Sequence, residues 1–95
     1  MITGKQRSYL KGLAHKLDPI VQIGKNGISE NLISQADEAL EARELVKFKI
    51  LPNCELDAKT TASELAEVLN AEFVMSMGKK FVLYRESEEP KIELY

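Results

Sequence analysis

Residues 20–29, IVQIGKNGIS, decide the fold because they lead from a short strand through a glycine turn into a helix. The first four are an apolar run of strand length, and the last, Ser29, is a residue type that caps helix N-termini. Between them stands Gly24-Lys25-Asn26-Gly27. Glycines lack a Cβ and can adopt positive φ, so another backbone can approach closely, while the lysine adds charge and the asparagine adds hydrogen-bonding groups. The tetrapeptide is therefore either an ordinary turn, since Asn-Gly is a common turn pair, or a clamp for a phosphate backbone.

A helix is expected before this stretch. Thr3-Gly4-Lys5-Gln6 has the pattern of a capping box, which satisfies backbone N–H groups at a helix start. Apolar residues then follow at the spacing of a core-facing helical stripe: Leu10, Leu13, Ala14 and Leu17. Pro19 disfavours helical geometry at Asp18, so we expect the helix to end near that residue.

A second helix and an alternating strand are expected after it. The helix begins at the Ser29 cap, and the strand covers residues 45–51. Its alternation predicts that Val46, Phe48 and Ile50 face the core and that Lys47 and Lys49 share the opposite face. Those two lysines are either ordinary solvated strand residues or part of a basic surface, and the sequence favours neither.

The C-terminal half predicts a third helix and a hairpin. Thr61-Ala62-Ser63-Glu64 offers a capping box for a helix that turns Leu65, Val68 and Leu69 inward. Two β-prone runs, residues 73–77 and 81–85, flank a basic turn at residues 78–80, and Met75 and Met77 are expected in the core. Residues 86–95 are charged and contain a proline, so they are either loose or form a small edge strand.

The resulting order is α-β-α-β-α-β-β, and 95 residues with 44% apolar side chains suit one domain with a small core. Strand-helix-strand passages favour right-handed crossovers within one sheet, and the hairpin adds antiparallel pairing. We therefore predict an α/β fold of the two-layer α+β kind, with a four-stranded mixed sheet packed by helices.

The charge of the chain is unevenly distributed. A net charge of -2 and a pI near 5.4 argue against nucleic acid, because phosphate binding depends on lysine and arginine. Residues 1–28, however, hold five basic residues against one acidic residue, whereas residues 29–95 carry a net charge of -6. The positive part contains the glycine tetrapeptide.

Residue types needed for several other functions are missing. One cysteine and one histidine exclude an internal disulfide and a Cys/His zinc cluster, and no Gly-Lys pair has the spacing of a Walker phosphate loop. No nucleophile, base and orienting carboxylate can be assigned together. We expect a monomeric cytoplasmic protein that is not an enzyme, with no cofactor, no metal site and no contact with a membrane.

Four segments taken together resemble the YhbY-like family of small bacterial RNA-binding proteins. This family is a stand-alone form of the CRM domain, which is found in chloroplast RNA splicing and ribosome maturation factors. The resemblance runs nearly end to end, so residues 1–95 are expected to form a single domain of this family. It rests on the order and spacing of residues 11–15 (KGLAH), 21–27 (VQIGKNG), 39–50 (ALEARELVKFKI) and 78–85 (GKKFVLYR).

The resemblance implies a fold similar to the C-terminal domain of translation initiation factor three and related to KH-like folds. It also implies association with ribosomal RNA in precursors of the large subunit. By this resemblance Gly24, Lys25, Asn26 and Gly27 act like the GXXG loop of KH domains. That loop joins two helices in KH domains, whereas here it is expected between a strand and a helix, so contacts cannot be transferred atom for atom.

Further RNA-binding residues are predicted from charge and placement alone. They are Lys5, Arg7, Lys11, His15, Lys47, Lys49, Lys79 and Arg85.

A different class of function stays open. The acidic faces of the second and third helices could bind a basic ribosomal protein through Asp37, Glu38, Glu41, Glu64 and Glu67. A small enzyme would require a pocket with convergent titratable groups, and the sequence indicates none.

Overall fold

The computed structural model describes residues 2–92 and has the predicted order of elements. They are α1 (Gly4–Ala14), β1 (Val21–Ile23), α2 (Glu30–Arg43), β2 (Leu45–Ile50), α3 (Ala58–Leu69), β3 (Glu72–Met77) and β4 (Lys80–Tyr84). Within residues 2–92, no helix has both the length and the apolar character to cross a membrane.

The four strands form one mixed sheet in the order β1-β2-β4-β3. β1 pairs with β2 in parallel, while β4 pairs with β2 and with β3 in antiparallel fashion. The mixed four-stranded sheet is therefore confirmed. β1 and β3 are its two edges.

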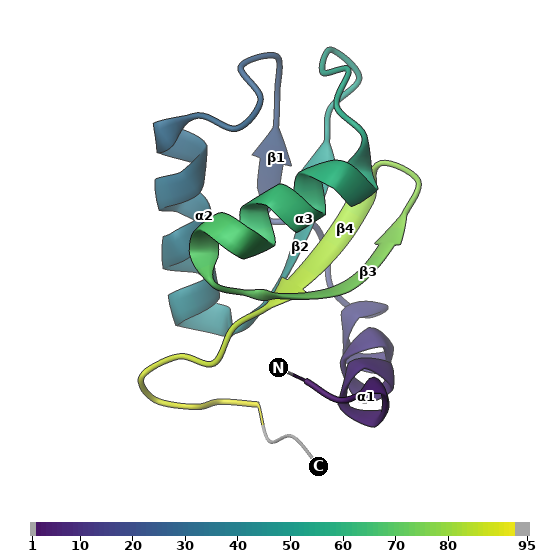
Figure 1. Ribbon diagram of the computed structural model, residues 1–95, viewed down its shortest axis with the longest axis vertical. Helices are drawn as coiled ribbons and strands as arrows, with labels where there is room; N and C mark the ends of the chain where they lie inside the picture. Colours follow the sequence, from purple (N-terminus) through teal and green to yellow (C-terminus); the bar gives the residue numbers. More distant parts are fainter. Residues whose placement is uncertain (1, 93–95) are drawn as a thin grey trace.

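Helices cover both faces of this sheet, which corrects the two-layer detail of the prediction. α2 and α3 pack on one face in a core that includes Val46, Phe48 and Phe81. α1 packs on the opposite face through Leu10 and Ala14, and Figure 1 shows it apart from α2 and α3. Because the sequence shows only that each helix has an apolar side, it does not indicate to which face of the sheet that side turns.

The centre of the larger core is a pair of stacked rings on neighbouring strands. Phe48 of β2 lies opposite Phe81 of β4, with ring centroids 4.8 Å apart and ring planes 7° from parallel. Both side chains are fully buried. The inward direction of Val46, Phe48 and Ile50 is thus confirmed, and it places Lys47 and Lys49 on the α1 face.

Two of the three predicted helix starts are confirmed. The Thr3 capping box is present, and the Ser29 hydroxyl accepts a hydrogen bond from the Leu32 N–H. The third helix instead starts at Ala58, because the Asp57 carboxylate accepts the Thr60 N–H at 2.9 Å. The predicted cap Thr61 is buried one turn inside the helix.

Several boundaries and inward positions also differ from expectation. α1 ends at Ala14 rather than near Asp18, since the N–H groups of Lys16 and Leu17 bond to carbonyls three residues back in tighter turns. Val68 and Met77 were expected in the core, but they are 59% and 60% exposed. Val68 lies on the outer side of α3, and Met77 lies beside the hairpin turn, beyond the part of the sheet that α1 covers.

A buried carboxylate at the end of α2 organises the C-terminal segment. Glu44 has φ +64° and no exposed surface, and its side-chain oxygens accept backbone N–H groups from Ser87, Lys91 and Ile92. Residues 87–92, for which the sequence left a loose tail or an edge strand open, are thus anchored by hydrogen bonds. No strand occurs in residues 86–92, and Leu94 lies outside the described residues.

The hydrogen bonds also set the acidity of this group. Burial by itself raises the pKa of the Glu44 carboxyl, but the bonds from Ser87, Lys91 and Ile92 outweigh it, so the pKa lies below its ordinary value of 4.5. A carboxyl with a lower pKa in the folded chain stabilises the fold above its ordinary pKa. That stabilisation is lost as the pH falls through the folded-state pKa.

We expect Glu44→Gln to lower the free energy of unfolding by about 2 kcal/mol or more at neutral pH, because an amide leaves buried N–H donors without acceptors. The difference from the wild type should shrink as the pH falls below 4.5. Urea unfolding at a series of pH values measures both effects, with the exposed Glu38→Gln as control. If the difference in unfolding free energy between Glu44→Gln and the wild type stayed constant down to pH 2, the assigned direction of the Glu44 pKa shift would be contradicted.

Candidate nucleic-acid interface

The glycine tetrapeptide forms a closed turn between β1 and α2. The Gly27 N–H donates to the Gly24 carbonyl oxygen at 2.9 Å, and Gly27 has φ +61°. A Cβ on Gly27 would also meet the Leu56 Cδ1 atom at 3.4 Å. Gly24 has no positive φ, and a Cβ there would approach only the Leu51 Cδ1 atom, at 3.9 Å. The turn itself therefore requires glycine at Gly27 but not at Gly24.

Three connecting segments meet at the end of the sheet that carries this turn. The Leu51 N–H donates to the Ile23 carbonyl oxygen at 2.9 Å, and the Ile50 N–H donates to the Lys79 carbonyl oxygen at 2.7 Å. The glycine turn, the segment after β2 and the β3-β4 hairpin are thereby aligned. Figure 1 shows the first two together at the top of the molecule.

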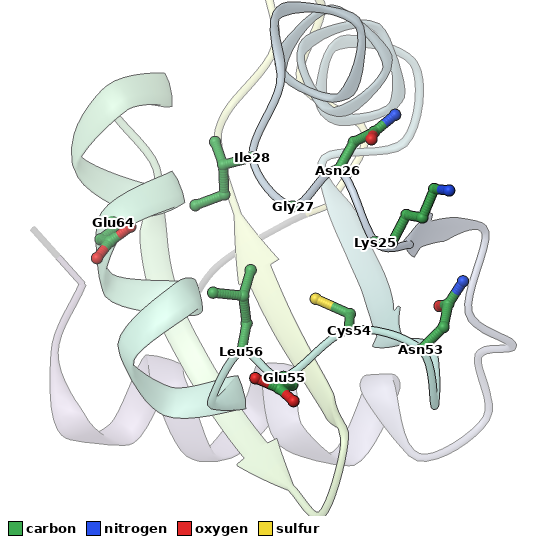
Figure 2. A pocket seen from close by; sticks show the side chains of 9 residues that line it. All are labelled: Lys25, Asn26, Gly27, Ile28, Asn53, Cys54, Glu55, Leu56 and Glu64. Carbon is green, nitrogen blue, oxygen red and sulfur yellow. The ribbon is translucent and has the colours of Figure 1, made fainter.

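Two hollows flank the glycine turn, and residues 25–27 line both of them. The polar hollow, about 200 Å³, is lined otherwise by Gln22, Gly24, Ser29, Asn31, Leu32 and Gln35. The acidic hollow, about 620 Å³, is lined otherwise by Ile28, Asn53, Cys54, Glu55, Leu56 and Glu64 (Figure 2). Lys25 lines both hollows, but of the two only the acidic hollow is lined by carboxylates, so an anion is repelled less on the polar side of the turn.

The α1 face of the sheet carries a second basic group, which we call the basic sheet face and define as Lys47, Lys49 and Lys80. Lys47 lies between two small hollows, one lined also by Lys16 and Arg43 and the other also by His15 and Lys80. Lys49 lies directly opposite Lys80 on the neighbouring strand. α1 leaves this end of the face open, because Lys80 is exposed and Met77 beside it is too.

The predicted RNA-binding residues fall into separate places. The glycine turn and Lys79 share one end of the sheet, and His15, Lys47 and Lys49 lie on the adjoining basic sheet face or at its border. Lys79 lies near Asp57, whose pKa is lowered first by the Thr60 N–H bond and to a smaller extent by the charge of Lys79.

The remaining predicted residues lie away from the glycine turn and the basic sheet face. Arg85 lies on the α2-α3 side of the sheet, where it forms an ion pair with Asp37 at 2.7 Å and donates to the Leu69 carbonyl oxygen. Its side chain is only 18% exposed. Arg7 is half-buried and donates through Nε to the Phe73 carbonyl oxygen. Lys5 and Lys11 are exposed on α1, Lys5 in its first turn.

Three basic residues on or beside the basic sheet face were not predicted: Lys80, and Lys16 and Arg43, which share a hollow with Lys47. Lys80 could have been found, because it alternates with the inward-facing Phe81 in the same way as Lys47 and Lys49 alternate with Phe48. Arg43 comes from α2, and no local pattern places it beside Lys47. Within residues 2–92, no group of three histidine, cysteine or acidic side chains could hold a metal ion.

The class of protein to which this fold and its glycine turn belong is shown by comparison with known families. The family model of the CRS1/YhbY (CRM) domain matches residues 2–85. The chain therefore belongs to the CRM domain family, as its sequence predicted.

Relatives over the full length agree with this assignment. The chain is 48% identical to the probable RNA-binding protein YqeI of Bacillus subtilis, over 99% of each chain, and 37% identical to an RNA-binding protein of Haemophilus influenzae, over 98% of this chain and 94% of that protein. It is also similar to the solution structure of SAV1595 from Staphylococcus aureus, described as a candidate RNA-binding protein, with a TM-score of 0.85, 52% identity and full coverage of both chains.

The two turn glycines should respond differently to alanine. Gly27→Ala should cost roughly 1 to 2 kcal/mol, because it combines a positive φ with a tight contact to Leu56. Gly24→Ala should leave the stability unchanged or slightly raised, since its backbone is compatible with alanine and a Cβ would lie at an ordinary contact distance, 3.9 Å, from the Leu51 Cδ1 atom. Thermal unfolding followed by circular dichroism compares the two. Equal losses would contradict the described turn.

Proposed function

We propose that this protein binds RNA through one surface that combines the glycine turn with the basic sheet face, and that its target is ribosomal RNA in precursors of the large subunit. Support for RNA comes from the names of the relatives and from the family. The observation that carries the proposal is the position of the exposed Lys25, on a turn at the sheet end that also carries Lys79 and borders Lys80.

The local charge at the binding surface explains how a protein with a net negative charge can bind RNA. Phosphates respond to cations within about a Debye length, roughly 8 Å at physiological salt, so the field at the binding surface counts for more than the total. Two acidic groups of α2, Asp37 and Glu41, are partly neutralised, because Arg85 pairs with Asp37 and lies 3.8 Å from Glu41.

The pairing of Lys49 with Lys80 supports a functional origin of the basic sheet face. Like charges directly opposite each other on neighbouring strands destabilise a sheet. A phosphate placed between the two ammonium groups would remove this repulsion. Lysines selected only for solubility would gain nothing from such a position.

Ribosomal RNA as the target rests on the family resemblance, and a cellular experiment tests it. Crosslinking in cells, followed by mapping of the crosslinked RNA, should place the sites in large-subunit precursors. Sites spread over messenger RNA would contradict this target and leave RNA binding itself intact.

The rival function, a contact between acidic helix faces and a basic ribosomal protein, predicts a different result. Co-sedimentation with ribosomal precursors would then survive nuclease treatment and charge reversal at the glycine turn, but fail after Glu38→Gln and Glu67→Gln. The pairing of Arg85 with Asp37 removes one of the acids available for such a contact.

RNA affinity should fall steeply with salt. If roughly three or four phosphates are neutralised, a plot of log Kd against log salt should have a slope of magnitude about 2 to 3. The Lys25→Glu, Asn26→Asp double variant should abolish most binding, whereas Lys5→Glu, in the first turn of α1, should have a small effect. Fluorescence anisotropy with a labelled ribosomal RNA fragment measures both. Salt-insensitive binding, or full binding by the double variant, would refute the proposal.

Lys80→Glu should move stability and RNA binding in opposite directions. The change converts a repulsive cross-strand pair with Lys49 into an attractive one, so the free energy of unfolding should rise by roughly 0.5 kcal/mol. Loss of a phosphate contact should reduce the magnitude of the salt slope by about one. Urea unfolding and anisotropy titrations on the same samples test this. Unchanged RNA binding would remove Lys80 from the interface.

A further inference from the structure

The acidic hollow beside the glycine turn has a composition that phosphate binding does not explain. Its floor is apolar, because Ile28 and Leu56 are half-buried and Cys54 is buried. Its rim holds the exposed side chains of Lys25, Asn26 and Asn53 together with the carboxylates of Glu55 and Glu64. Figure 2 shows Ile28 and Leu56 between Glu64 on one side and Asn26 and Asn53 on the other.

We propose that this hollow binds one unpaired RNA base and that its carboxylates favour guanine over uracil. The proposal rests on the proposed function, since it assumes that the glycine turn holds the RNA backbone. Residues 25–27 line both hollows, so a strand crossing the turn has its phosphates on the polar side and can direct a base to the other side. At about 620 Å³, the hollow is large enough for a base.

The lining matches a base better than a phosphate. Apolar side chains contact the faces of an unstacked base, and polar groups around them bond to its edge. Carboxylates repel phosphates, but they accept hydrogen bonds from ring N–H and amino groups. The space is shaped by Gly27, whose missing Cβ allows Leu56 to approach the turn closely.

Carboxylates on the rim give the preference for guanine. Guanine presents a ring N–H and an amino group next to each other, which can donate to both oxygens of one carboxylate. Uracil presents a single N–H between two carbonyl oxygens, and these oxygens are repelled by a carboxylate. Glu55 and Glu64 are exposed, so their replacement should not disturb folding.

The test uses RNA hairpins with one common stem and three different eight-nucleotide loops. One loop is all uridine, and in the other two every second uridine is replaced by guanosine or by inosine. Inosine keeps the ring N–H of guanosine and lacks its amino group. The wild type should bind the guanosine loop about five- to tenfold more tightly than the uridine loop, with inosine between them.

In the Glu55→Gln, Glu64→Gln double variant this ratio should fall to about twofold or less, because an amide cannot accept both donors of guanine. The slope of affinity against salt should stay as in the wild type, since the phosphate contacts are unchanged. Glu67→Gln, an exposed residue of α3 outside the lining of the hollow, is the matched control and should keep the full preference.

The other outcomes are distinct. Salt-dependent binding without a guanosine preference would overturn the base site and leave the proposed function standing, whereas no binding to any hairpin would refute both. If the double variant bound all loops more tightly at an unchanged ratio, the carboxylates would act only by repelling phosphates. Saturable binding of an arginine tripeptide, lost in the same variant, would assign the hollow to a basic protein segment instead. Either result overturns the base site.

Discussion

The stacked pair of Phe48 and Phe81 is the constraint on which the rest of the structure depends. It fixes the register between the two central strands, and side chains alternate along a strand, so this register decides the direction of every neighbour. With the two rings under α2 and α3, the lysines at 47, 49 and 80 face the opposite side. A shift by one residue would bury these charges and expose the rings.

The registers of β1 with β2 and of β2 with β4 together align the connections at one end of the sheet. The glycine turn leaves β1, the segment after β2 lines the acidic hollow, and the hairpin brings Lys79 beside Ile50. The turn therefore stands between surfaces of different charge. Its polar side and the basic sheet face suit phosphates, and its acidic side suits a group that donates hydrogen bonds. A small acidic protein can in this way present one surface that attracts RNA.

Local patterns were sufficient to predict the elements and much of the turn. The Thr3 and Ser29 caps, the inward direction of Phe48 and the hairpin all follow from a few neighbouring residues. The start of α3 was predicted wrongly because Asp57 and Thr61 both have capping side chains, and the burial of Thr61 decided between them.

Residues placed by long-range packing were not predictable in this way. Arg85 is basic and follows a strand, as an RNA-binding residue could, but its partner Asp37 lies 48 positions earlier in the chain. Glu44 likewise depends on a segment 43 to 48 residues later. The side of the sheet that α1 covers, and hence the extent of the open basic sheet face, also follows only from the assembled fold.

We expect RNA to contact the end of the sheet that carries the glycine turn and to continue over the basic sheet face. Titration of isotopically labelled protein with a ribosomal RNA hairpin, followed by amide chemical shifts, tests it directly. The amide signals of residues 24–27, Lys49 and Lys80 should shift, with little change at Asp37 and Glu67 on the outer sides of α2 and α3. Shifts confined to those two helices, with residues 24–27 unaffected, would contradict it.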